Sequence, residues 1–339
     1  MKKWVNKKGS KNPNFNRNLL IGIVIIVLLV GGFFLFGQSD DKLDSNILEP
    51  EVTELEVTKP EVIEESVEVS MLEILSDHPQ ECMNKVFNRF INVFGVYVAA
   101  TEDAPLDYVT HTANVLAQYI DNNEDGIPDD PKVLEILVKE RFIVPIWSEK
   151  DRETFWECNN HIPDEDHISM AASMYYDGDQ WAIGGIEKTG TWDTNLEEVW
   201  HIVSVGWSEA YPEYFGEKFK DEEKRNEVIP SKLLDAMDAA RGGQFISIPN
   251  SYPADAWYAY YDSTCDYICM AHEYFYWILM SNIDALDPSI TSKCSRSSDE
   301  WNICTKSELM RKDILAYELL NNYGFNLPTV IPDGSYKNH

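Results

Sequence analysis

The chain has 339 residues, of which 28 are basic and 58 acidic, so that its net charge at pH 7 is −30. Six of the basic residues lie within the first eighteen positions, which contain no acidic residue, so the remainder of the chain carries a net charge of −36. Such a negative field repels nucleic acid and anionic lipid surfaces and attracts cations. The composition therefore excludes a nucleic-acid-binding protein.

The N-terminal part has the pattern of a membrane anchor. Residues 1–18 are basic, and residues 19–37 form an apolar run without charge that is just long enough to cross a bilayer as a helix. Because positive flanks stay in the cytoplasm, we expect a single-pass protein of the cell membrane with a cytoplasmic N-terminus and an extracellular C-terminal domain. The alternative is a cleaved signal peptide, but the run is long for one and no small-residue cleavage site follows it.

Two further regions follow the anchor. Residues 38–70 are rich in Glu, Val, Pro and Thr and low in aromatic residues, a composition that predicts a disordered acidic stalk. Residues 71–339 are rich in aromatic residues and long enough for one large domain or two small ones. This part is expected to be globular.

All six cysteines lie in the globular part, and an even number in an exported domain favours disulfides. Cys294 and Cys304 would close a short loop, and Cys82 and Cys158 a long one. Cys265 and Cys269 could pair with each other or with partners elsewhere. A zinc–cysteine site is disfavoured because there is no second close pair of cysteines.

Apolar periodicity predicts a helix-rich α+β domain. The expected helices are residues 106–120, 131–140, 194–205, 232–240, 265–280 and 307–322. The expected strands are residues 141–147, 167–176 and 180–186, the last two separated by the turn sequence Asp177-Gly178-Asp179.

The segment 121–130 joins two of these helices and has the sequence DNNEDGIPDD. It resembles the first nine positions of an EF-hand or dockerin-type loop, in which carboxylate and amide oxygens hold Ca²⁺ and a glycine makes the sharp turn. The resemblance assigns the calcium ligands to Asp121, Asn123, Asp125, the carbonyl of Ile127, and Asp129.

This loop departs from the family at its twelfth position, where Lys132 replaces the bidentate Glu. Asp130 or Glu135 could supply the missing ligand instead. The alternative is a turn without an ion, because Asn and Asp are turn formers in their own right. We expect a structural Ca²⁺ site that clamps the two helices.

The helix predicted at 194–205 contains Glu197-Glu198-Val-Trp-His201. Residues four apart lie on one face of a helix, so Glu197 and His201 can bind the same ion. The pattern resembles the H-E-x-x-H helix of zincin metallopeptidases, with Glu197 in place of the first His. The resemblance assigns the general base to Glu198, which would accept a proton from water.

Glu273 is the candidate for a third ligand. It lies on the predicted helix 265–280, which is apolar or aromatic on nearly every face, so an uncompensated carboxylate there would be costly. Zincins of the gluzincin type take their third ligand from a Glu on a later helix, and they place an edge strand beside the active-site helix. The resemblance covers roughly residues 180–280 and assigns that edge strand to residues 180–186.

The same residues also allow interpretations without a metal. Glu197 and Glu198 could form a solvated face, His201 could be a core histidine, and Glu273 could pair with Arg241. Two carboxylates and one imidazole also cancel the charge of a divalent ion, which weakens its effect on water. The bound ion would be Zn²⁺ or another divalent transition metal.

The sequence thus predicts a membrane-anchored, extracellular, zincin-like metallohydrolase that acts on peptides or proteins and has a structural Ca²⁺ site. The competing hypothesis is a calcium-stabilised surface domain that binds or adheres without catalysis.

Overall fold

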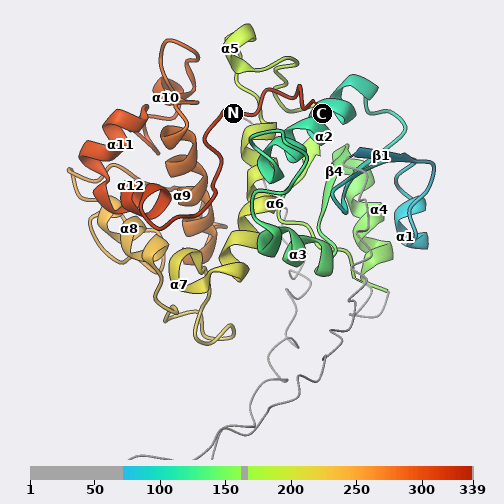
Figure 1. Cartoon of the computed structure of the whole chain (residues 1–339). Helices are drawn as coiled ribbons and strands as arrows, with labels where there is room; N and C mark the ends of the chain where they lie inside the picture. The colour runs from blue at the N-terminus through green and yellow to red at the C-terminus, as the bar shows by residue number, and fades with distance from the viewer. Residues whose placement is uncertain (1–71, 162–166, 338–339) are drawn as a thin grey trace, which may run out of the picture. The chain divides into compact units, whose positions relative to one another are not determined.

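The computed structural model describes residues 72–161 and 167–337 (Figure 1). The predicted cytoplasmic segment 1–18, anchor 19–37 and stalk 38–70 lie outside these residues. Within the described part of the chain, no helix combines the length and apolarity needed to cross a membrane.

The N-terminal half contains a five-stranded mixed sheet in the order β1-β2-β3-β4-β5. The strands are β1 (Leu72–Leu75), β2 (Arg89–Val93), β3 (Val96–Ala100), β4 (Ile143–Trp147) and β5 (Met174–Tyr175). The first three pair antiparallel, whereas β4 and β5 continue the sheet in parallel. Phe94 and Gly95, both at positive φ, form the tight turn between β2 and β3, as two-residue hairpins require.

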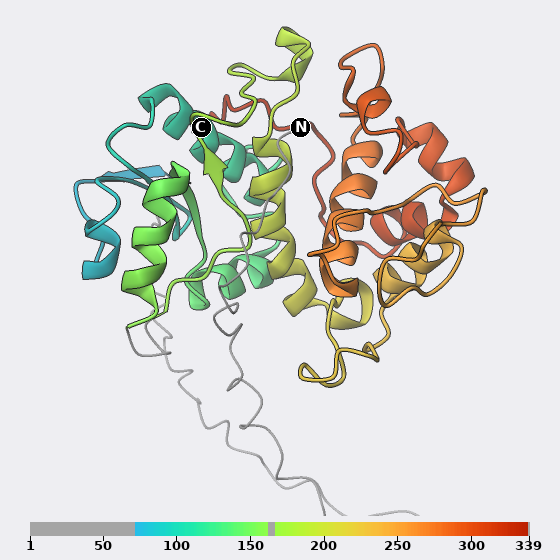
Figure 2. The ribbon, with the colours of Figure 1, turned by 180° about the vertical axis from the view of Figure 1, so that it is seen from behind.

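Helices cover both faces of this sheet because the strand residues alternate between two apolar clusters. On one face, α1 (Glu81–Asn84) and α4 (Glu149–Asn159) pack over Phe90, Ile143 and Trp147. On the other, α2 (Leu106–Ile120) and α6 (Asn195–Ala210) pack over the strands, and α3 (Pro131–Lys139) lies against α6. Figures 1 and 2 show α6 between the sheet-bearing half and the C-terminal helices.

The C-terminal half is helical and surrounds α9 (Tyr267–Asn282), whose side chains are mostly buried. Around α9 pack α6, α8 (Lys232–Arg241), α11 (Lys306–Lys312) and α12 (Ile314–Asn321). The short helices are α5 (Ile186–Thr189), α7 (Pro212–Phe215) and α10 (Lys293–Arg296). The fold of the described residues is therefore α+β and rich in helix.

After α12 the chain returns to the sheet-bearing half and lies along α2 (Figure 1). Gln118 on α2 bonds Asp333 and the amide of Gly334, and Asn122 bonds the backbone at Val330. A Cβ at Gly334 would collide with the ring of His111, so only glycine permits this close approach. We call residues 326–336 the C-terminal strap.

The three disulfides join Cys82 to Cys158, Cys265 to Cys269, and Cys294 to Cys304. The two pairings expected from the sequence are confirmed, and the undecided pair is resolved as Cys265 with Cys269. Such bonds are typical of proteins that fold in an oxidising compartment.

Most of the predicted helices are confirmed, but three predicted elements differ from the structure. The strand predicted at 167–176 is reduced to the two residues of β5, Met174–Tyr175. Residues 180–186 form no strand, because Gly184 and Gly185 adopt positive φ and turn the chain. The zincin-type edge strand expected there is therefore absent. The predicted helix 307–322 is divided at Asp313, whose side chain caps a new helix by accepting the amide of Ala316.

Candidate metal centre between helices α6 and α9

Helix α6 carries Glu197 and His201 one turn apart, facing α9. Leu196, Val199 and Trp200 of the same helix are fully buried and pack it against α2 and the sheet. Glu197 lies in the first helical turn, where the helix dipole favours negative charge. The apolar packing of the remaining faces thus fixes the direction in which the polar pair points.

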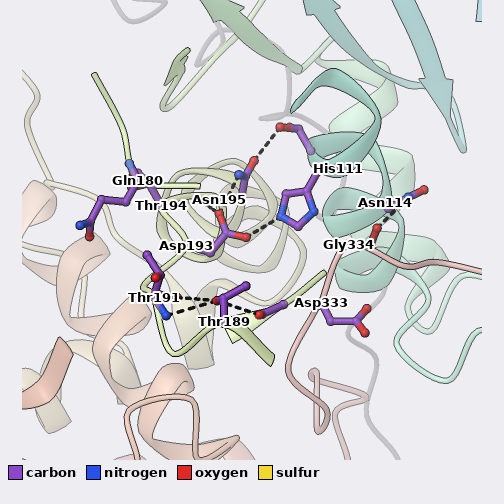
Figure 3. A network of polar contacts seen from close by, with 12 residues as sticks. His111, Asn114, Gln180, Thr189, Thr191, Asp193, Thr194, Asn195, Asp333 and Gly334 are labelled. Atoms are coloured by element: carbon purple, nitrogen blue, oxygen red, sulfur yellow. Dashed lines mark hydrogen bonds and ion pairs between the residues drawn. The ribbon is translucent and has the colours of Figure 1, made fainter. Parts of the chain in front are cut away.

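A buried polar network holds the beginning of α6 in place (Figure 3). His111 Nε2 on α2 lies 2.5 Å from Asp193 Oδ2, and the other oxygen of Asp193 accepts the amide of Asn195 at 3.1 Å. Thr112 donates to the side-chain oxygen of Asn195 at 2.6 Å. These contacts lie two to four residues before Glu197, so they anchor the turn that carries it.

Helix α9 supplies Glu273. The side chain of Asp266 caps this helix by accepting the amide of Cys269, one turn before Glu273. The hydroxyl of Tyr260 donates to Glu273 Oε1 at 3.2 Å, which leaves the other carboxylate oxygen facing His201. Arg241 does not pair with Glu273; its guanidinium instead donates to the carbonyl of Phe245 and lies near three aromatic rings.

The structure brings the three predicted ligands together. One ligand atom from each of Glu197, His201 and Glu273 lies within 4.8 Å of the other two, and His201 Nε2 is 3.5 Å from Glu273 Oε2. Among the described residues this is the single group of three or more His, Cys, Asp or Glu side chains that meets so closely. The arrangement is of the size that a single ion bridges.

The imidazole of His201 lacks normal hydrogen-bond partners. Its side chain is only 7% exposed, Nε2 is at the outer limit of hydrogen bonding to Glu273, and Nδ1 has no partner among the described residues. Buried polar atoms are almost always bonded. An imidazole nitrogen and two carboxylate oxygens within 4.8 Å of one another are a donor set that a divalent cation accepts, so the residues present are suitable for a metal.

Charge coupling within the group is strong. Burial alone would lower the pKa of His201, but the carboxylate of Glu273, helped by Glu197 and Glu217, raises it above its usual value. Burial would likewise raise the pKa of Glu273, yet the contact with His201 holds it below its ordinary value. In the absence of a metal, these two residues thus behave as an ion pair.

Glu198 lies beside the group but is not one of the converging residues. Burial raises its pKa well above the ordinary range, and the charges of Glu197, Asp179 and Glu273 add to this effect. Burial is also the main cause that raises the pKa of Asp179 to about 6. The charges of the group therefore act on Glu198, as expected of a residue next to the proposed ligands.

Several residues of the site had no clear signal in the sequence. His272 stacks on His201 with ring centroids 4.8 Å apart, and it bonds the carbonyl of His201 and Oε2 of Glu217. Lys293 Nζ lies 3.1 Å from Glu197 Oε2. Burial raises the pKa of Glu300 to about 8, and the negative charge of Glu273 contributes. Of these residues, only His272 could have been suggested by the sequence, because it is adjacent to Glu273.

The calcium-like loop has a different arrangement. Asp121 is fully buried, and its two oxygens accept the amides of Asp125 and Gly126 at 3.2 and 2.8 Å. Asn123 also accepts the amide of Asp125, and Asp125 accepts that of Ile127. The predicted ligand oxygens thus support the turn itself.

The remaining acids around the loop are also engaged. Asp129 accepts the amide of Asn122 at 2.7 Å, and burial followed by the charges of Asp121 and Asp125 raises its pKa. Asp130 caps α3 and accepts the hydroxyl of Tyr211, so it is not free to replace the missing twelfth ligand. Glu135 is exposed on α3.

Comparisons of the chain with protein-family models, with curated proteins and with solved structures found no match. The function is therefore argued from the geometry of the site.

Proposed function

We propose that the chain is a zincin-like metallohydrolase that acts on peptides, with Glu197, His201 and Glu273 as metal ligands. The observation that carries this proposal is the meeting of two carboxylates with a buried imidazole, one ligand atom from each lying within 4.8 Å of the other two. The metal would be Zn²⁺ or another divalent transition metal, for which such oxygen and nitrogen ligands are suitable.

A divalent metal, when bound, supplies Lewis-acid chemistry. The role of Glu198 in the proposed reaction is to accept a proton from the attacking water and to deliver it to the leaving amine. Glu198 follows Glu197 directly in α6, so its side chain is rotated by about 100° from the ligand face. Tyr260 holds Glu273 through its 3.2 Å hydrogen bond and so orients this ligand.

The proposal also covers the cellular location of the domain and a structural calcium site. The basic segment 1–18 and apolar run 19–37 support a cell-membrane anchor with the domain outside, and the three disulfides agree with export. A protease added to intact cells should then remove the domain from Asp40 onward, and protection of the domain would refute this topology. We assign a structural Ca²⁺ to the loop 121–130.

Metal analysis tests the function most directly. Purified protein exchanged against Zn²⁺ and then freed of excess ion should retain about one ion per chain, and it should cleave members of a mixed peptide library. Protein that retains no transition metal when supplied with Zn²⁺, Mn²⁺ or Co²⁺ would refute the metal centre.

The alternative is a non-catalytic surface-binding domain stabilised by calcium. One observation favours it: Lys293 already pairs with Glu197, so this carboxylate has a cation without any metal. Retention of Ca²⁺ alone, together with no cleavage of any library peptide, would support that alternative.

A further inference from the structure

Lys293 is a largely buried cation in contact with a proposed ligand. It opens α10, beside the Cys294–Cys304 disulfide, and its Nζ lies 3.1 Å from Glu197 Oε2. The side chain is only 17% exposed. Its Nζ lies 5.1 Å from the ring centroid of Trp192 and 5.2 Å from that of Trp277. Aromatic faces of this kind hold an ammonium group in position.

The electrostatics of the centre make this cation significant. A divalent ion bound by Glu197 and Glu273 would have its charge cancelled by the two carboxylates, which reduces its power to polarise a bound molecule. A lysine that shares the Glu197 carboxylate restores one positive charge to the group. At short range inside a protein, such a charge is only weakly screened.

We infer that Lys293 sets the charge of the metal centre: it shares Glu197 with the ion, keeps the loaded centre net positive, and thereby lowers the affinity for the ion. This inference rests on the proposed metal function. It differs from a purely structural role, in which Lys293 would only neutralise Glu197 and hold it in the ligand position.

The two roles predict opposite changes in metal affinity. In Lys293→Met, which keeps the apolar stem and removes the charge, affinity for Zn²⁺ measured by chelator competition should increase by about 10- to 100-fold, because a repulsive charge is lost. Turnover of a cleaved library peptide should fall at the same time. Lys293→Arg, which keeps the charge, should bind Zn²⁺ within about threefold of the parent protein.

The controls separate this inference from the metal function itself. Lys220→Met removes an exposed lysine that pairs with Glu227 at 3.2 Å, and it should leave Zn²⁺ affinity unchanged. Weaker or unchanged Zn²⁺ binding by a folded Lys293→Met protein would overturn the role of Lys293 alone. Failure of the parent protein to bind Zn²⁺ would overturn the metal centre and this inference with it. If Lys293→Met does not fold, Lys293→Gln removes the same charge while keeping a polar end.

Discussion

The α6–α9 centre and the loop 121–130 both gather acidic side chains, but they satisfy them in opposite ways. In the loop, the oxygens of Asp121, Asn123 and Asp125 accept amides of the loop itself. In the centre, Glu197 and Glu273 converge on the imidazole of His201 and are held from other segments, Glu197 by Lys293 Nζ and Glu273 by the hydroxyl of Tyr260. Side chains that bond amides of their own turn fix the shape of the loop, whereas side chains that converge from two helices form a ligand set of the size that one ion bridges.

The largest expected effect tests the centre. His201→Ala removes one of three ligands, so Zn²⁺ affinity should fall by at least about 10³-fold and any hydrolysis should disappear with it. Chelator competition measures the affinity. His161→Ala is the matched control, since His161 is exposed and bonds only the carbonyl of Glu157 among the contacts of its ring that the structure records. Equal Zn²⁺ binding by the His201 variant and the control would show that His201 is not a ligand and would refute the proposed centre.

The next effect separates the base from the ligands. Glu198→Gln preserves the size of the side chain and removes its ability to accept a proton, so turnover should fall by about 10²–10⁴ while bound metal stays stoichiometric. Steady-state kinetics and metal analysis of the same preparation measure both quantities. Loss of the metal in this variant would mean that Glu198 is a ligand, and unaltered turnover would exclude it as the base.

A smaller effect is expected from the loop. Calcium at 100 times its Kd should stabilise the protein by about 2.7 kcal/mol, which thermal unfolding with and without chelator would detect. Asp125→Ala should abolish that difference. Asp255→Ala, in the 242–266 connection, should not. A calcium response that persists in the Asp125 variant would place the ion outside the loop.

The smallest effect is a pH dependence of stability in the metal-free protein. Glu300 has a pKa of about 8 in the fold, chiefly through burial, so it keeps its proton where the unfolded chain has lost it. The folded state then binds more protons, and its stability should decline as pH rises from about 4.5 to 8. Glu300→Gln should reduce this decline by about 2 kcal/mol, as measured by urea unfolding, which is less than the full pKa shift would give because Glu300 is partly exposed to solvent. An identical decline in both proteins would assign it to other groups.

The elements that the sequence predicted well carry local signals. Helix α3 begins at Pro131 after the capping side chain of Asp130, and α8 begins after Ser231 and ends at Gly242 in the left-handed conformation. The β2–β3 hairpin escaped notice because its turn is Phe94-Gly95, without the Asn or Asp that usually marks such turns.

The candidate centre likewise combines residues that the local sequence predicted with residues that it did not. Glu197 and His201 were predictable as a pair because their spacing places them on one helical face, and Glu273 because a carboxylate stood out in an apolar helix. Lys293 and Glu300 come from the connection after α9, which shows no periodicity that fixes its path. Their positions depend on tertiary packing and on the Cys294–Cys304 bond, neither of which can be read from local sequence.

The C-terminal strap has a consequence for the order of folding. Asp333 bonds Gln118 and Tyr336 bonds Asp121, in each case across 215 positions of the chain. Because a chain is synthesised from its N-terminus, α2 and the acidic loop are made long before these partners exist. Contacts between such distant positions also form slowly. The loop proposed to hold calcium therefore reaches its final form only after the strap has closed, and a chain interrupted near residue 325 would present that loop unsupported.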